Sequence, residues 1–154
     1  MNDRRHVTGV LVHLASYLHC ASGDQRLMAA SYRDLRVWQL AMQLVAGVYE
    51  QTRCFPKHEI YGLTSQMRRA AVSIPSDIAE GKGRSSDRDR AHFFCHARGS
   101  LLELETQIFI AQQLEYLSDS ESEKLIANTT QLDRMLNALI QSLQDLEHPG
   151  QSVA

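Results

Sequence analysis

The chain has 154 residues, of which 44% are hydrophobic, enough for one domain with a hydrophobic core. Its net charge of −2 excludes a protein that holds nucleic acid through an overall excess of positive charge. Three cysteines at unrelated spacings, without a C-x-x-C motif, predict free thiols in a reducing compartment and therefore a cytoplasmic protein. Since no apolar run approaches the roughly 20 residues of a membrane span, we expect no membrane partner.

Residues 1–30 differ in pattern from the rest of the chain. An apolar run at residues 10–18 follows two arginines, as in a signal peptide, but His13 interrupts it and no clean small-residue cleavage site follows. We therefore interpret residues 1–30 as an N-terminal extension that is flexible, and residues 1–27 as dispensable for folding. A secretory signal is the alternative.

Four segments with apolar residues spaced by three and four follow, and this periodicity predicts four α-helices. We expect the helices near residues 32–54, 58–80, 87–117 and 119–147. Because the connections are short, neighbouring helices should be antiparallel. The predicted fold class is all-α, an antiparallel up-and-down four-helix bundle over residues 31–148, with a C-terminal tail at residues 149–154.

The expected helix ends carry recognisable capping signals. Ser31 with Asp34, and Ser118 with Glu121, have the spacing of capping boxes at the starts of the first and fourth helices. Pro75 lies inside the second helical stretch, where it should kink the helix.

The first helix has an unusually wide apolar surface. Its apolar positions span roughly 200° of arc, whereas one core face needs a stripe of about 100°. A monomer would leave residues such as Trp38, Leu44 or Val45 exposed, at a cost of roughly 1.5–3 kcal/mol for each side chain. The pattern therefore predicts a homo-oligomer. We expect its contacts to join an acidic face of the fourth helix to a basic rim on another subunit.

Two arginines and two glutamates lie on or near the apolar stripes of adjacent predicted helices: Arg68, Arg69, Glu103 and Glu105. Such a set can be a catalytic acid–base group. We favour a structural polar network, in which guanidinium groups pair with carboxylates across a helix interface. Removing the carboxylate that faces an arginine should then cost about 3–5 kcal/mol.

Positive charge gathers around the turn between the second and third helices. The cations that form this basic rim are Lys82, Arg84, Arg88 and Arg90. They are candidates for binding nucleic acid or a protein partner through ionic contacts. No aromatic residue stands among them, so base stacking is not indicated. Complementarity between subunits and simple solvation are the alternatives.

Sequence motifs for other chemistry are weak. His92 and His96 lie one helical turn apart, but the glutamates of a di-metal bundle are missing, so we expect exposed histidines rather than a metal site. The stretch G-K-G at residues 81–83 follows a helix and lacks the remainder of a phosphate-binding loop, which favours an interhelix turn. We predict no catalytic residue, no metal and no cofactor, hence no enzyme.

Five motifs occur together between residues 35 and 105. They are L-x-V-W-x-x-A (35–41), F-P-x-x-E-x-Y-G-L-T-x-Q (55–66), R-R-A-A-x-S-I-P (68–75), I-A-E-G (78–81) and G-S-L-x-E-x-E (99–105). In this order they resemble the signature of a bacterial family of four-helix-bundle proteins encoded by intervening sequences in 23S ribosomal RNA genes. Asp77 stands where the family pattern usually has Asn.

The resemblance implies a four-helix bundle that assembles into a ring, commonly of five subunits. The chain is also similar to the accessory protein of diversity-generating retroelements, which shares the fold and uses a basic face to bind RNA and a reverse transcriptase. We therefore expect a non-enzymatic, homo-oligomeric binding or assembly module. The alternative is an RNA-binding accessory factor that acts with ribosomal RNA or with a nucleic-acid enzyme such as a reverse transcriptase.

Overall fold

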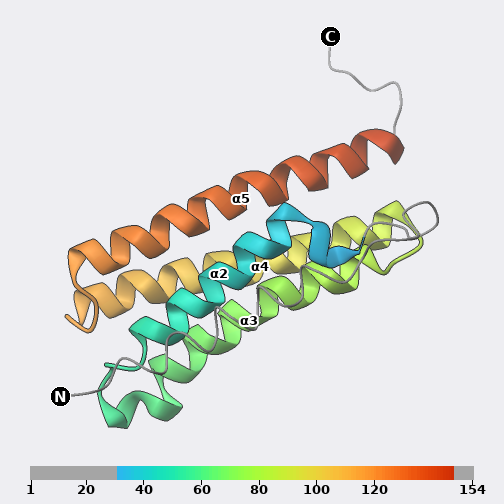
Figure 1. Ribbon diagram of the computed structural model, residues 1–154. Coiled ribbons are helices and arrows are strands. Elements are labelled where there is room, and N and C mark those ends of the chain that lie inside the picture. Colours follow the sequence, from blue (N-terminus) through green and yellow to red (C-terminus); the bar gives the residue numbers. More distant parts are fainter. Residues whose placement is uncertain (1–30, 148–154) are drawn as a thin grey trace, which may run out of the picture. The chain divides into compact units, whose positions relative to one another are not determined.

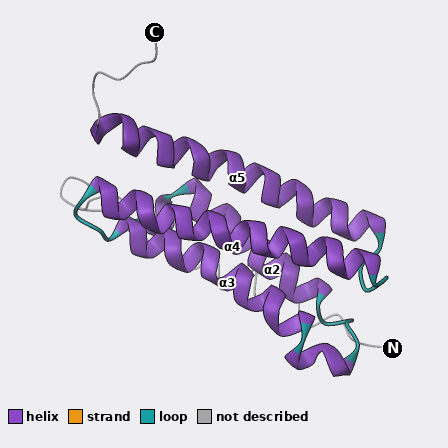
Figure 2. Cartoon of the chain, turned by 180° about the vertical axis from the view of Figure 1, so that it is seen from behind, coloured by secondary structure: helices purple, strands orange, loops and turns teal. Residues whose placement is uncertain are grey.

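The computed structural model describes residues 31–147, and the predicted N-terminal extension and C-terminal tail lie outside the described residues. Helices, turns and loops make up the described part, which contains no strand (Figure 2). The helices in chain order are η1 (Tyr32–Asp34), α2 (Arg36–Gln51), η2 (Lys57–Tyr61), α3 (Leu63–Lys82), α4 (Asp87–Gln113) and α5 (Asp119–Glu147), where η denotes a 3₁₀ helix. The predicted all-α fold is confirmed.

The four long helices form an up-and-down bundle, as predicted (Figure 1). Helix α3 packs against α2 and α4, and α5 packs against α4 and α2, so each helix has two neighbours in the described bundle. All four helices contribute fully buried apolar side chains to one core: Leu44, Met67, Ile74, Ile78, Leu101, Leu104, Ile108, Leu132 and Leu136. No helix in the described range is long and apolar enough to cross a membrane.

The first helix begins later than predicted. Ser31 and Asp34 form the expected capping box, but they cap the short helix η1 rather than α2. Leu35 is extended, with φ −71° and ψ 120°, and separates the two helices. Helix α2 therefore starts at Arg36 instead of residue 32, and it ends at Gln51 instead of residue 54.

The second long helix starts later than the predicted residue 58, and the Glu59 carboxylate caps its start. Residues Lys57–Tyr61 form η2, and α3 begins only after Gly62. The Glu59 side chain, which accepts a hydrogen bond from the Leu63 backbone N–H at 2.8 Å, satisfies one of the free N–H groups at the start of α3. The predicted helix over residues 58–80 is thus two helices joined by a side-chain cap.

The later helix starts agree with the sequence. Ser86 caps α4 by accepting a hydrogen bond from the Asp89 backbone N–H at 3.0 Å. At the start of α5, the Ser118 backbone N–H donates to the Glu121 carboxylate at 2.9 Å, and the Glu121 N–H donates to the Ser118 hydroxyl at 3.4 Å. The predicted capping box is confirmed, and hydrogen bonds from the Ser118 hydroxyl and backbone lower the pKa of Glu121.

Candidate interaction surface between helices α2 and α3

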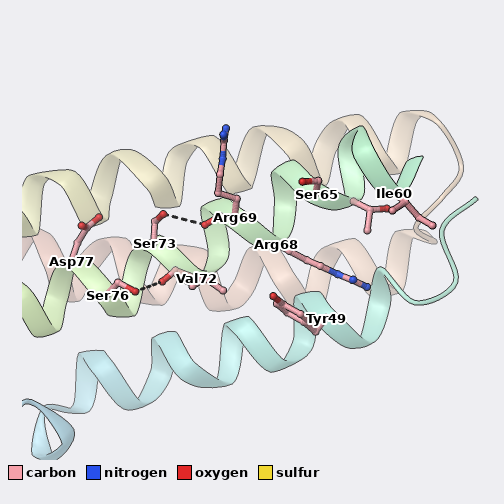
Figure 3. Close-up of a pocket in the computed structure, with 10 residues that line it drawn as sticks. Tyr49, Ile60, Ser65, Arg68, Arg69, Val72, Ser73, Ser76 and Asp77 are labelled. Atoms are coloured by element: carbon pink, nitrogen blue, oxygen red, sulfur yellow. Dashed lines mark hydrogen bonds between the residues drawn. The ribbon is translucent and has the colours of Figure 1, made fainter. Parts of the chain in front are cut away.

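A groove of about 530 Å³ lies between α2 and α3 in the described bundle. Tyr49 of α2 lies on one side of the groove, and Ile60 of η2 lies with eight residues of α3 on the other side (Figure 3). We call it the Arg68 groove. Its serine hydroxyls Ser73 and Ser76 donate to backbone carbonyl groups of their own helix, at 3.1 and 2.8 Å. The buried hydroxyl of Thr64, by contrast, has no hydrogen-bond partner in the described part of the chain.

Arg68 is held in a fixed position on this groove. Its Nε donates to the Thr52 hydroxyl at 2.8 Å, and its guanidinium lies over the ring of Tyr49, 4.8 Å from the ring centroid (Figure 3). Thr52 in turn donates to the Val48 carbonyl at 2.8 Å. Within residues 31–147 the two terminal nitrogens of Arg68 have no hydrogen-bond or ion-pair partner. A half-buried guanidinium fork is therefore oriented and left open to bind a carboxylate or another acceptor.

The other members of the predicted polar network lie elsewhere. Arg69 points away from α2 in Figure 3, and its guanidinium is 3.9 Å from the carboxylate of Glu103. Glu105 accepts a weak hydrogen bond of 3.4 Å from the Thr129 hydroxyl on α5. The four predicted residues thus belong to three separate groups of contacts rather than to one network.

The prediction that this network is buried is wrong for its ion pair. The side chains of Arg69 and Glu103 are 69% and 48% exposed, so water screens their interaction. An exposed pair of this kind contributes below about 1 kcal/mol, well short of the 3–5 kcal/mol expected for a desolvated pair. Replacing Glu103 by alanine should therefore have only a small effect on the free energy of unfolding.

A second, apolar cleft of about 300 Å³ adjoins the Arg68 groove and shares Val72 and Ser76 with it. Trp38, Met42 and Val45 of α2 line this apolar cleft. These positions belong to the wide apolar arc predicted for the first helix. Leu44, however, is fully buried in the core, so the prediction that a monomer would expose it is wrong. We refer to the Arg68 groove and the apolar cleft together as the α2–α3 surface.

Asp77 lies half-buried at the far end of the Arg68 groove. Burial raises the pKa of its carboxyl group, the electrostatic influence of His96 opposes that rise, and the negative charge on Glu80 adds to it. The ionised carboxylate is therefore less stable in the folded chain than in the unfolded chain at neutral pH.

Replacing Asp77 by asparagine should raise the melting temperature at neutral pH. The folded-state pKa of Asp77 lies above its ordinary value of 3.8, so its contribution to stability is complete below that value and is lost as the pH rises through the folded-state pKa. Asparagine is neutral throughout. Thermal melts of parent and variant should differ most near pH 7 and converge in acid. A pH-independent difference would show that ionisation of Asp77 is not the cause.

The basic rim at the α3–α4 turn is partly neutralised by its own carboxylates. Arg84 pairs with Glu80 at 2.6 Å and lies over the ring of Phe93 at 4.3 Å. Arg90 pairs with Asp87 at 2.5 Å. These contacts occupy two of the four cations that the sequence marked for binding.

The other two cations of the rim remain available. Arg88 is exposed and Lys82 is half-buried, and neither has an ion-pair partner among residues 31–147. The rim therefore offers two unpaired positive charges at one turn of the bundle, fewer than the four that its sequence suggested.

The two predicted histidines lie side by side on α4. The rings of His92 and His96 lie 4.4 Å apart, centroid to centroid, on one face of α4. Among the described residues no group of three or more His, Cys, Asp or Glu side chains is placed to hold a metal ion.

A family model for 23S rRNA-intervening sequence proteins matches residues 33–138 of the chain. The chain belongs to this family. A protein of unknown function from the S23 ribosomal protein family of Bacteroides thetaiotaomicron has a similar crystal structure, with a TM-score of 0.64 and 17% sequence identity over 68% of this chain and 97% of that chain. At this identity the likeness shows the fold alone. No curated protein matches the chain.

The match to the 23S rRNA-intervening sequence protein family covers both walls of the α2–α3 surface. It begins at residue 33 and ends at residue 138, within α5. The chain thus shares with its family the helices that build the Arg68 groove and the apolar cleft.

Proposed function

We propose that this 23S rRNA-intervening sequence protein is a non-enzymatic assembly module of the cytoplasm and works as a homo-oligomer. The resemblance noted from the sequence implies a ring of five subunits. The α2–α3 surface is the observation that carries the proposal. It combines a pre-oriented arginine with apolar side chains that the single subunit leaves partly exposed.

The exposed apolar side chains of this surface lie close together rather than scattered. Met42 and Tyr49 of α2 are each 42% exposed, Val72 of α3 is 41% exposed, and Ile60 is 53% exposed. They line the two adjoining depressions that share Val72. Contiguous apolar patches of this kind mark binding sites more often than isolated exposed residues do. Burial of each such side chain against another subunit would favour association by roughly 1.5–3 kcal/mol at most.

Placing a charge on this surface should separate the subunits without unfolding them. In the variant Met42→Asp, a carboxylate would have to be buried in the interface, which is costly unless it is paired. Sedimentation at micromolar concentration should show a folded monomer, with helical circular dichroism equal to that of the parent. Gln43→Asp is the matched control, since its side chain is exposed on the same helix and lines no part of the α2–α3 surface. If Met42→Asp sediments like the parent oligomer, α2 is not in the interface.

A second candidate function is RNA binding through the basic rim, acting with ribosomal RNA or a reverse transcriptase. The unpaired charges of Lys82 and Arg88 favour it. The logarithm of the affinity falls as the logarithm of the salt concentration rises. Each cation that contacts a phosphate makes this slope more negative by about 0.7–0.9. Replacing both residues by glutamine should therefore flatten the salt dependence of binding to a structured RNA. Unchanged binding would exclude the rim as the RNA site.

A further inference from the structure

We infer that the α2–α3 surface of one subunit receives the outer face of α4 from a second copy of the chain. This inference rests on the proposed homo-oligomer and adds which two surfaces meet. Copies would then join through different surfaces, one from each subunit, in a heterologous contact.

Helix α4 carries its own unpartnered apolar stripe. Leu102 and Phe109 are 46% and 47% exposed. They lie seven residues apart, about two helical turns, and so share one face of the helix. Thr106 lies between them and is also exposed, with its hydroxyl bonded to the Leu102 carbonyl at 2.9 Å. We call these three residues the α4 stripe.

The stripe and the α2–α3 surface lie on different sides of the bundle. Helices α2 and α4 each pack against α3 and α5 but make no close backbone approach to each other in the described bundle, so they are diagonal partners. One subunit can therefore use both surfaces at once. Such a subunit would contact one neighbour through α2 and α3 and another neighbour through α4.

The two surfaces lie at matching heights. The end of α2 and the start of α3 lie at the same end of the bundle as the end of α4, where the rings of Phe55 and Tyr116 pack 5.5 Å apart. A helix rises ~1.5 Å per residue along its axis. Measured along the axis, Arg68 is therefore about 7.5 Å from the start of α3, and Phe109 is about 6 Å from the end of α4. Val72 and Leu102 are about 13.5 and 16.5 Å from the same ends. Rotation about an axis parallel to the bundle would keep these heights level.

The chemistry of the two surfaces is complementary. Tyr49 and Arg68, residue types enriched in interface cores, would face Phe109, whose ring can pack on both. The part of α4 that carries the stripe, residues 99–113, contains Glu103 and Glu105 and no Lys or Arg. A neighbour of net negative charge is thus presented to the open fork of Arg68.

A mixing experiment tests the inference. Val72→Asp disables the α2–α3 surface, and Phe109→Asp disables the α4 stripe. Each variant alone should be a folded monomer of 17.4 kDa by native mass spectrometry, because each lacks one half of the contact. An equimolar mixture, with one variant tagged, should form a one-to-one dimer and nothing larger, since only one intact pair of surfaces remains. Gln43→Asp should assemble like the parent.

Other outcomes would overturn the inference. If the parent assembles but the mixture stays monomeric, or if Phe109→Asp alone assembles like the parent, the two surfaces do not meet. A parent chain that is itself monomeric would instead refute the proposed homo-oligomer. Circular dichroism identifies any variant that fails to fold, and Ile60→Asp then replaces Val72→Asp as the groove variant.

Discussion

Replacing Leu132 by alanine is expected to lower the free energy of unfolding by about 2–5 kcal/mol. Leu132 is fully buried at the centre of α5, where all four helices contribute to the core. The substitution removes three side-chain carbons and leaves a cavity that the neighbouring helices fill only in part. Urea denaturation in the Met42→Asp background measures the loss without a contribution from assembly.

The neighbouring position on α5 gives the control for this prediction. Gln131 is exposed, so Gln131→Ala should change the free energy of unfolding by no more than about 0.5 kcal/mol. Equal effects at residues 131 and 132 would contradict the assignment of Leu132 to the core.

Replacing Gly81 by alanine is expected to destabilise the bundle by about 1–3 kcal/mol, because the added methyl group overpacks a tight contact between α3 and α4. A Cβ atom at residue 81 would lie 2.9 Å from the ring of Phe94 and 3.0 Å from the Cβ of Phe93. Phe94 is buried and cannot move into solvent without cost. The close approach of the two helices at this point therefore requires glycine.

Replacing Gly99 by alanine should instead stabilise the bundle. Gly99 lies inside α4, and a Cβ atom there would meet no heavy atom of the described residues within 4 Å, apart from its chain neighbours and the backbone of its own helix. Alanine in a helix interior is favoured over glycine by about 1 kcal/mol. Thermal melts of Gly81→Ala and Gly99→Ala should thus shift in opposite directions. Shifts of the same sign would show that helix propensity, rather than the contact with Phe94, decides both.

The fold followed from the sequence because its signals are local and agree with one another. The capping box at Ser118 and the regular apolar spacing on α5 predict the helix start and its buried face from adjacent residues alone. The boundaries that were wrong depend on contacts that the periodicity does not contain. Leu35 becomes extended between two helices, and the Glu59 carboxylate caps α3 from the preceding 3₁₀ turn.

The candidate site was less predictable, because it depends on the rotation of one helix against another. The sequence identified Arg68 as a residue in need of a partner. Its partners are the Tyr49 ring on α2 and the hydroxyl of Thr52, the residue that follows α2, rather than a glutamate on α4. One signal was present: Tyr49 and Thr52 are three residues apart at the end of the first helix and so lie on one face. Arg69, next in sequence, points to the other side of α3.

The central claim is that the exposed apolar side chains of this bundle are subunit contacts. Native mass spectrometry of the parent chain over a range of micromolar concentrations tests it most directly. We expect one dominant species whose mass is a several-fold multiple of 17.4 kDa and which disappears in Met42→Asp. A parent chain that remains at 17.4 kDa throughout that range would contradict the claim.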